Sequence, residues 1–143
     1  MEKLVLAADH GGFELKEFIK KIIAGLGGYE ILDLGTNSTG SVDYPEYGQR
    51  AAETVVSGQA ERGIIFCGTG IGISIAANKV KGIRAANCTS ELMAEMSRRH
   101  NNANILALGG RIVEPELAKK IVKIWLDTPF DGGRHEQRVA QIE

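Results

Sequence analysis

Five short apolar runs recur along this 143-residue chain, and a segment of helical periodicity follows each of them. The runs are rich in Val, Ile and Leu, as strands buried on both faces of a parallel sheet are. Strand–helix alternation over five units predicts an α/β fold, a Rossmann-like open five-stranded parallel sheet with helices on both faces in three layers. The expected strands are Leu4–Ala8, Tyr29–Gly35, Gly63–Cys67, Ile83–Asn87 and Asn104–Gly109.

The intervening segments carry helix signals of different kinds. An apolar stripe runs from Phe13 to Leu26, with Lys and Glu facing away from it. Prolines that suit a first helical turn stand at Pro45 and Pro115. The segment from Ile71 to Val80 is so apolar that we expect it to be buried. Two further helices are expected, one over Ser90–His100 with a cap-like Thr89-Ser90 at its start, and one from Arg134 onward.

Composition narrows the function classes. The length suits one domain spanning residues 1–143. Lys+Arg number 17 against 18 Asp+Glu, so the net charge of −1 gives no support to nucleic-acid binding. No stretch approaches the ~18 apolar residues of a membrane span. Asp9 and His10 interrupt the first apolar run, so a signal peptide is not expected. We expect a cytoplasmic protein with reduced thiols at its two cysteines.

The ends of the predicted strands are the places to look for a site. In open parallel sheets, ligands bind outside the carboxyl ends of the strands, where the strand order switches direction. Five polar or glycine-rich segments follow the expected strands. They are Asp9-His10, Asn37–Tyr44, Cys67–Gly72, Asn87–Thr89 and Gly109–Arg111.

The most informative of these segments follows the third strand, in the sequence IIFCGTGIGIS from Ile64 to Ser74. Glycines at alternate positions after Cys67 let the backbone approach a ligand, and the next helix adds partial positive charge. That arrangement suits an anion and favours a thiolate at Cys67, which could act as a nucleophile or a general base. The alternative is a buried, inert strand cysteine. The spacing fits neither a dinucleotide fingerprint nor a P-loop.

Other polar residues add to this candidate site, each with a structural alternative. Asp9 and His10 could act in acid–base catalysis, or they could bind a sugar hydroxyl and a phosphate. The structural alternative is that Asp9 only caps a helix. Arg134 and Arg138 share one helical face and with Arg111 could clamp a phosphate, or they could form a solvated basic face. His100 stands at a helix end, where a cation is favoured in any case.

Further residues carry weaker signals. Tyr44 could line the pocket or could be a plain core or helix-entry tyrosine, and Cys88 is interpreted as structural. No Cys/His spacing resembles a zinc site, and carboxylates do not cluster as magnesium ligands do, so no metal or cofactor is expected.

Taken together, these motifs resemble the type B ribose-5-phosphate isomerases, the family shared with the galactose-6-phosphate isomerase subunits. The resemblance extends over nearly the whole chain. Its matching segments are AADHGGFELK, LGTNSTGSVDYP, GIIFCGTGIGISIAANKVKGIRAA, SRRHNNANILALGGRIV and GGRHEQRV. It implies a sugar-phosphate isomerase domain that interconverts ribose 5-phosphate and ribulose 5-phosphate in the pentose phosphate pathway.

The resemblance also implies a role for each matching residue. Cys67 is implied as the base that moves a proton between C1 and C2, and the loop as the cradle of the enediolate. Asp9 and His100 are implied in ring opening, Asn101 in contact with a sugar hydroxyl, and a set of basic residues in phosphate binding. The loop residues are Gly68, Thr69, Gly70, Ile71 and Gly72, with a catalytic hydroxyl on Thr69, and the phosphate residues are His10, Arg111, Arg134 and Arg138.

Members of this family are dimers or dimers of dimers with sites shared between subunits, so the resemblance implies a homo-oligomer. One branch replaces the cysteine by a glutamate at the position of Ile73, and this chain follows the cysteine branch. Three alternatives stay open. They are isomerisation of a six-carbon substrate such as allose 6-phosphate or galactose 6-phosphate, a non-catalytic sugar-phosphate sensor, and a redox sensor that pairs Cys67 with Cys88.

Overall fold

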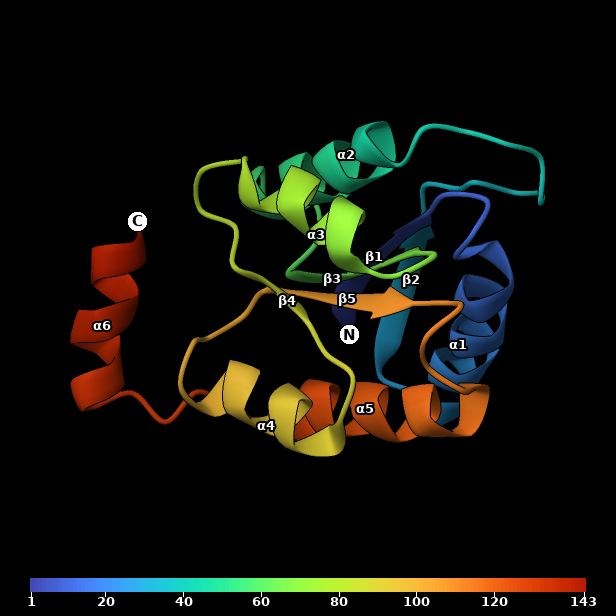
Figure 1. The fold of residues 1–143 in the computed structure, drawn as a ribbon. Helices are drawn as coiled ribbons and strands as arrows, with labels where there is room; N and C mark the ends of the chain where they lie inside the picture. Colours follow the sequence, from blue (N-terminus) through green and yellow to red (C-terminus); the bar gives the residue numbers. More distant parts are fainter.

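A computed structural model describes all residues from 1 to 143 and shows the predicted alternation of strands and helices (Figure 1). The strands are β1 (Glu2–Ala8), β2 (Tyr29–Asp33), β3 (Arg62–Cys67), β4 (Ala85–Asn87) and β5 (Ile105–Gly109). The helices are α1 (Phe13–Leu26), α2 (Tyr44–Val56), α3 (Ile71–Asn78), α4 (Glu91–Arg99), α5 (Pro115–Asp127) and α6 (Arg134–Ile142).

All five strands are parallel, in the order β2-β1-β3-β5-β4. The chain leaves β1 toward one edge of the sheet and returns to place β3 on the other side of β1. The strand order therefore switches direction between β1 and β3, where a ligand is expected. The register pairs Ala8 with Phe66 and Cys67 with Gly109. The loops after β1, β3 and β5 consequently emerge side by side.

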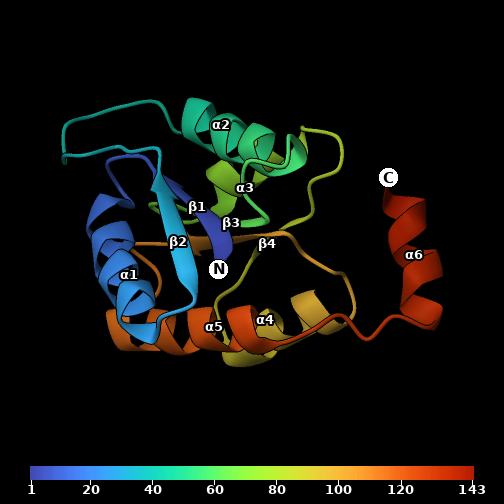
Figure 2. The ribbon, with the colours of Figure 1, turned by 180° about the vertical axis from the view of Figure 1, so that it is seen from behind.

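The helices form two outer layers, which confirms the predicted three-layer architecture. Helices α2 and α3 cover one face of the sheet, and α1, α4 and α5 cover the other (Figures 1 and 2). Strand residues alternate between these faces, as the pleat requires. Leu4 and Leu6 pack toward the α1, α4 and α5 layer, whereas Val5 and Ala7 pack toward α2 and α3. Cys67 belongs to the α2 and α3 side.

Two details of the elements differ from the sequence prediction. Strand β4 begins at Ala85 rather than Ile83, and β2 ends at Asp33 rather than Gly35. The apolar helix α3 is not buried throughout, because Ile71 is 55% exposed and Ile75 is 56% exposed. A helix of eight residues packs only one face on its own chain, and Ile73 and Ala77 occupy that face. The rest of α3 is an apolar surface.

Helix α6 begins at Arg134, as predicted, but it stands apart from the sheet and the other helices (Figures 1 and 2). None of its residues is buried. An ion pair between Arg84 and Glu143 joins its far end to the strand β4 side of the molecule. The hydrophobic effect therefore does little within this chain to hold α6 in place. No helix of the chain has the length and apolar character that crossing a membrane requires.

Candidate active site

The loop after β3 folds back onto the thiol that precedes it. Cys67 is 4% exposed, and its Sγ accepts a hydrogen bond from the backbone N–H of Gly70 at 3.1 Å. A sulfur that accepts from an N–H at the start of a helix sits in the positive potential of that helix end. Cys67 thus differs from an inert core cysteine in having both a donor and a loop around its sulfur.

A left-handed backbone at Gly70 makes this turn, with φ of +79°. A Cβ at Gly70 would overlap Oδ1 of Asn87, which projects from the end of β4. Asn87 also lies 3.4 Å from the carbonyl oxygen of Thr69 through Nδ2. Glycine is therefore required at position 70 both by its backbone angle and by the close approach of Asn87.

The same loop leaves several backbone donors for a ligand. The N–H groups of Gly68, Thr69 and Gly72 donate to no acceptor within the chain. The N–H of Ile71 donates to Oγ1 of Thr69 at 3.1 Å, so the Thr69 hydroxyl proton remains available to a substrate oxygen. Unpaired donors at a glycine-rich turn and a helix start form a cradle for a developing oxyanion.

Tyr44 belongs to this site rather than to the core. It opens α2 with its side chain 41% exposed, and a Cβ at Gly72 would lie 2.6 Å from its ring. The ring therefore packs directly over the last glycine of the loop. Tyr44 is thus a helix-entry residue, one of the alternatives that the sequence left open, and its ring also lies beside the loop.

The end of β1 places Asp9 and His10 beside this loop. Oδ1 of the buried Asp9 accepts from the N–H groups of Gly11 and Gly12 at 2.9 and 3.1 Å, in the turn that precedes α1. Asp9 is not the helix cap that the sequence suggested as an alternative, because the N-cap of α1 is Gly12, which has no side-chain cap bond. No hydrogen bond within the chain engages the other carboxylate oxygen. Nδ1 of His10 accepts from the N–H of Val42 at 3.1 Å. The proton of a neutral His10 ring is thereby placed on Nε2, which can donate to a ligand.

Arg111 completes the group around Cys67. Its backbone N–H donates to the carbonyl oxygen of Gly68 at 2.9 Å, and a Cβ at Gly68 would lie 2.9 Å from its Nη1. The guanidinium therefore lies over the first glycine of the loop. Arg111 and His10 also line one hollow of about 230 Å³. A guanidinium and an imidazole donor at one hollow suit a phosphate, and the carboxylate of Glu14 lines the same hollow.

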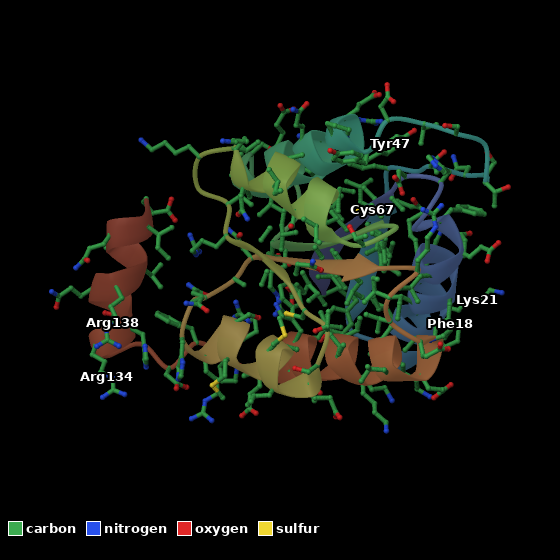
Figure 3. The ribbon with its side chains drawn as sticks, in the orientation of Figure 1. Phe18, Lys21, Tyr47, Cys67, Arg134 and Arg138 are labelled. Carbon is green, nitrogen blue, oxygen red and sulfur yellow. The ribbon has the colours of Figure 1, made fainter.

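The remaining predicted residues lie elsewhere in the chain. Arg134 and Arg138 project from α6, on the far side of the molecule from Cys67 (Figure 3). His100 follows the end of α4, and Asn101 lines a separate cleft of about 390 Å³ beside the end of α6. Within one chain, the predicted site is therefore divided into a group around Cys67 and a group around α6.

The group around α6 contains contacts that sequence reasoning missed. The rings of His100 and His135 stack with centroids 4.2 Å apart and planes at 13°. Partial burial lowers the pKa of His135, and the positive charges of His100, Arg134 and Arg138 lower it further. No pattern in the sequence links His100 to His135, because the two lie on different helices joined through α5.

The second cysteine behaves as the sequence suggested. Cys88 is buried, and this burial raises the pKa of its thiol to about 11 despite an opposing hydrogen bond from Ser97. Cys88 therefore remains a neutral thiol at neutral pH, which makes it a poor partner for thiol chemistry. The redox-sensor alternative loses its resolving thiol by this argument.

Comparison with known proteins identifies relatives over the full length of the chain. The Ribose/Galactose Isomerase family matches residues 4–142. Ribose-5-phosphate isomerase B of Escherichia coli is 49% identical, and the match covers 99% of this chain and 95% of that protein. D-erythrulose-4-phosphate isomerase of Pectobacterium atrosepticum is 40% identical, over 99% of this chain and 93% of its own.

Solved structures agree with the sequence matches. Ribose-5-phosphate isomerase B of Clostridium thermocellum superposes with a TM-score of 0.96 at 56% identity, over 98% of this chain and 94% of that chain. A ribose 5-phosphate isomerase of Thermotoga maritima superposes with a TM-score of 0.95 at 52% identity, over 99% and 97% of the two chains. The similarity therefore includes the loop after β3 and helix α6.

Proposed function

The chain belongs to the ribose/galactose isomerase family, and we propose that it interconverts ribose 5-phosphate and ribulose 5-phosphate through an enediolate. One observation carries the proposal. Sγ of Cys67 is held by the N–H of Gly70 at the base of a loop with unpaired backbone donors. A base beside an oxyanion cradle is what proton transfer next to a carbonyl requires.

The chemistry needs no electron acceptor outside the sugar. The Cys67 thiolate removes the proton from C2 of the open-chain aldose, and the electron pair forms the enediolate as the carbonyl oxygen gains charge. The loop N–H groups and the Thr69 hydroxyl stabilise that charge. The proton of the O2 hydroxyl then passes to O1, which moves the negative charge to O2. The resulting Cys67 thiol returns its proton to C1 as the C2=O2 carbonyl forms, which gives the ketose and restores the thiolate. A carbon acid gives up its proton slowly in water, so this stabilisation supplies much of the acceleration.

Binding at the other end of the sugar positions the reacting carbons. We assign the phosphate to the hollow between His10 and Arg111, where Nε2–H and the guanidinium both donate. Bidentate contact with a guanidinium fixes orientation as well as affinity. A fixed phosphate holds C1 and C2 of the sugar next to Cys67, so the free energy of phosphate binding orients the reacting carbons.

Ring opening and the rest of the phosphate clamp are assigned to a second copy of this chain. Arg134 and Arg138 lie apart from Cys67 in their own chain (Figure 3). His100 stacks on His135 of α6, and Asn101 lines the cleft beside the end of α6. Helix α6 has no buried residue, and α3 leaves Ile71 and Ile75 exposed. Pairing of two copies would cover these surfaces and complete each site. The free carboxylate oxygen of Asp9 would act with the partner's His100 on the ring.

The proposal places the whole chain, residues 1–143, in one isomerase domain that acts in the cytoplasm, in the pentose phosphate pathway, without a cofactor. Substrate size is the property on which relatives differ, since one is a D-erythrulose-4-phosphate isomerase. Erythrulose is a four-carbon sugar, so this relative does not itself point to larger substrates, and the six-carbon sugar phosphates remain alternatives on the family resemblance alone. A non-catalytic sensor is disfavoured, because a sensor has no need of a thiolate inside an oxyanion cradle.

The test is isomerisation of ribose 5-phosphate by the pure protein in EDTA, beside Cys67→Ala and Cys88→Ala. Wild-type protein should turn over, and Cys67→Ala should lose about 10²–10⁴-fold in kcat, the range that general bases contribute. Cys88→Ala is the matched control, a buried thiol outside the loop, and should keep its kcat within about twofold because it touches no reacting group.

Other outcomes would redirect the assignment. Turnover that survives Cys67→Ala would move the base to another residue. No turnover by folded wild-type protein would direct the assay to allose 6-phosphate and galactose 6-phosphate, compared by kcat/KM. Tight binding of every phosphosugar without any turnover would establish the sensor instead.

A further inference from the structure

Three potential metal ligands from three segments meet beside α6. They are His100 at the end of α4, Asp131 in the connection between α5 and α6, and His135 in the first turn of α6. One ligand atom of each lies within 4.8 Å of the others. The two rings stack at 4.2 Å, so both imidazoles already share one small volume.

The chain holds these segments together by contacts that do not involve the histidine rings. The backbone N–H of Asp131 donates to the carbonyl oxygen of Arg99 at 3.0 Å, and Nε of Arg99 lies 3.2 Å from both Asp131 carboxylate oxygens. Nε of Arg98 also donates to the carbonyl oxygen of Thr128 at 3.1 Å. The connection before α6 is therefore fixed to the end of α4, which keeps His135 near His100.

We propose that His100, His135 and Asp131 form a reversible zinc site, and that zinc bound there inhibits the isomerase. Two imidazole nitrogens and a carboxylate oxygen are a usual protein ligand set for Zn²⁺, with water in the fourth position. Zn–N distances of about 2.0–2.1 Å require the rings to turn out of their stack. Both histidines are only partly buried, and rotation about Cα–Cβ and Cβ–Cγ provides that movement.

The charges around the site indicate that zinc binds there reversibly and is not needed for folding. Arg99 occupies the Asp131 carboxylate, and Arg134 and Arg138 add positive charge on α6. A metal ion has to displace the Arg99 contact and works against that positive potential. The fold forms without the ion, and the site fills when zinc is supplied.

The inhibitory part rests on the proposed function, in which His100 serves ring opening. A histidine nitrogen bonded to zinc has no lone pair for a sugar proton. Zinc should therefore block turnover of the cyclic substrate by occupying a ring-opening group, while the Cys67 loop remains unchanged. His135 has no assigned part in turnover, so it can be removed to separate zinc binding from catalysis.

Binding is measured first, on EDTA-stripped, dialysed protein, by calorimetric titration with Zn²⁺ and by visible absorption with Co²⁺. We expect one ion per chain and a four-coordinate cobalt spectrum without thiolate charge transfer. His135→Gln should weaken binding at least tenfold, since even changes in the outer shell of a metal site cost about 10–100-fold. Cys67→Ala, which removes the thiol of the candidate active site, should bind as wild type does.

Activity is measured second, against added Zn²⁺. Wild-type turnover should fall over the concentration range in which zinc binds, and His135→Gln should keep its zinc-free turnover and resist inhibition. Equal affinity of wild type and His135→Gln, or a thiolate band that disappears in Cys67→Ala, would overturn the site. Binding through His135 without inhibition of an active enzyme would overturn the inhibitory role. Binding through His135 by a chain that never isomerises would support the site and overturn the proposed function instead.

Discussion

At the scale of the residue, Gly70 determines the geometry of the candidate site. Its φ of +79° turns the loop so that its N–H meets Sγ of Cys67, and Asn87 closes the space where a side chain would lie. The thiol and the oxyanion cradle depend on this single turn. A change at Gly70 should therefore affect activity out of proportion to stability.

Gly70→Ala tests that dependence. A strained left-handed alanine costs about 1–3 kcal/mol of unfolding free energy, and the displaced N–H should lower kcat/KM by about 10²-fold or more. Gly58→Ala is the matched control, with φ of +83° but no atom within 4 Å of the new Cβ. Urea unfolding and steady-state kinetics on both variants separate the effects. Equal kcat/KM in the two variants would show that the turn at Gly70 is not needed.

The sequence was sufficient to predict part of this site. Cys67 and its glycines are contiguous and follow a strand, so their meeting is a local property. The contact between Asn87 and Gly70 depends on the order of β3, β5 and β4, which no local pattern encodes. The stacking of His100 on His135 likewise depends on the path of the chain around α5. The sequence therefore predicted the loop and the strand-end residues Asp9, His10 and Arg111 beside it, but neither the contact of Asn87 with Gly70 nor the stacking of the two histidines.

At the scale of the element, a buried ion pair ties α1 to β2. The Lys16 side chain is fully buried, and its Nζ donates to both carboxylate oxygens of Asp33 at 2.9 and 2.8 Å. Oδ1 of Asp33 also accepts from the N–H of Gly35 at 2.8 Å. This pair fixes the end of β2, and with it the start of the loop that leads to Val42 and His10.

Asp33→Asn should destabilise the fold in a pH-dependent way. It leaves the buried Lys16 charge without its main partner, a loss of about 3 kcal/mol at neutral pH. Burial raises the pKa of Asp33, but hydrogen bonds from Lys16, Lys20 and Gly35 outweigh it and bring the net pKa below the usual 3.8. The charged carboxylate therefore stabilises the protein fully above about pH 4, and this contribution is lost as pH falls through the folded pKa.

Urea unfolding of wild type and Asp33→Asn from pH 7 to pH 3 measures this contribution. The difference in unfolding free energy should be constant from pH 7 to about pH 5 and should shrink below pH 4. A difference that stays constant to pH 3 would place its origin in packing rather than in charge.

The helices show the same contrast: their starts could be predicted from neighbouring residues in the sequence, whereas their burial could not. Pro115 at the start of α5 and Ser90 as the cap of α4 were readable, and Oγ of Ser90 accepts from the N–H of Met93 at 3.2 Å. The exposure of α3 could not be predicted from the sequence, because the apolar composition of this helix alone indicates burial. Burial depends on which faces of a helix find a neighbour, and no part of this chain covers Ile71 and Ile75.

At the scale of the whole molecule, the exposed apolar face of α3 predicts assembly. Ile75→Glu should place a charge in the proposed subunit contact and shift the protein to a lower mass in size-exclusion chromatography with light scattering. Leu26→Glu is the control, because Leu26 is 43% exposed at the end of α1 on the opposite layer. Activity should fall with mass in Ile75→Glu only. A wild-type protein that is already monomeric and fully active would remove the case for shared sites.

The division of the candidate site between two chains yields the sharpest prediction. Cys67→Ala and His100→Ala should each be inactive alone, because every site in either protein lacks one group. After subunit exchange, half of the dimers are mixed, and each mixed dimer has one site with both defects and one intact site. Mixing equal amounts should therefore restore about a quarter of wild-type activity. Mass spectrometry of the intact dimers verifies exchange, and exchange without recovery would mean that Cys67 and His100 serve the same site from one chain.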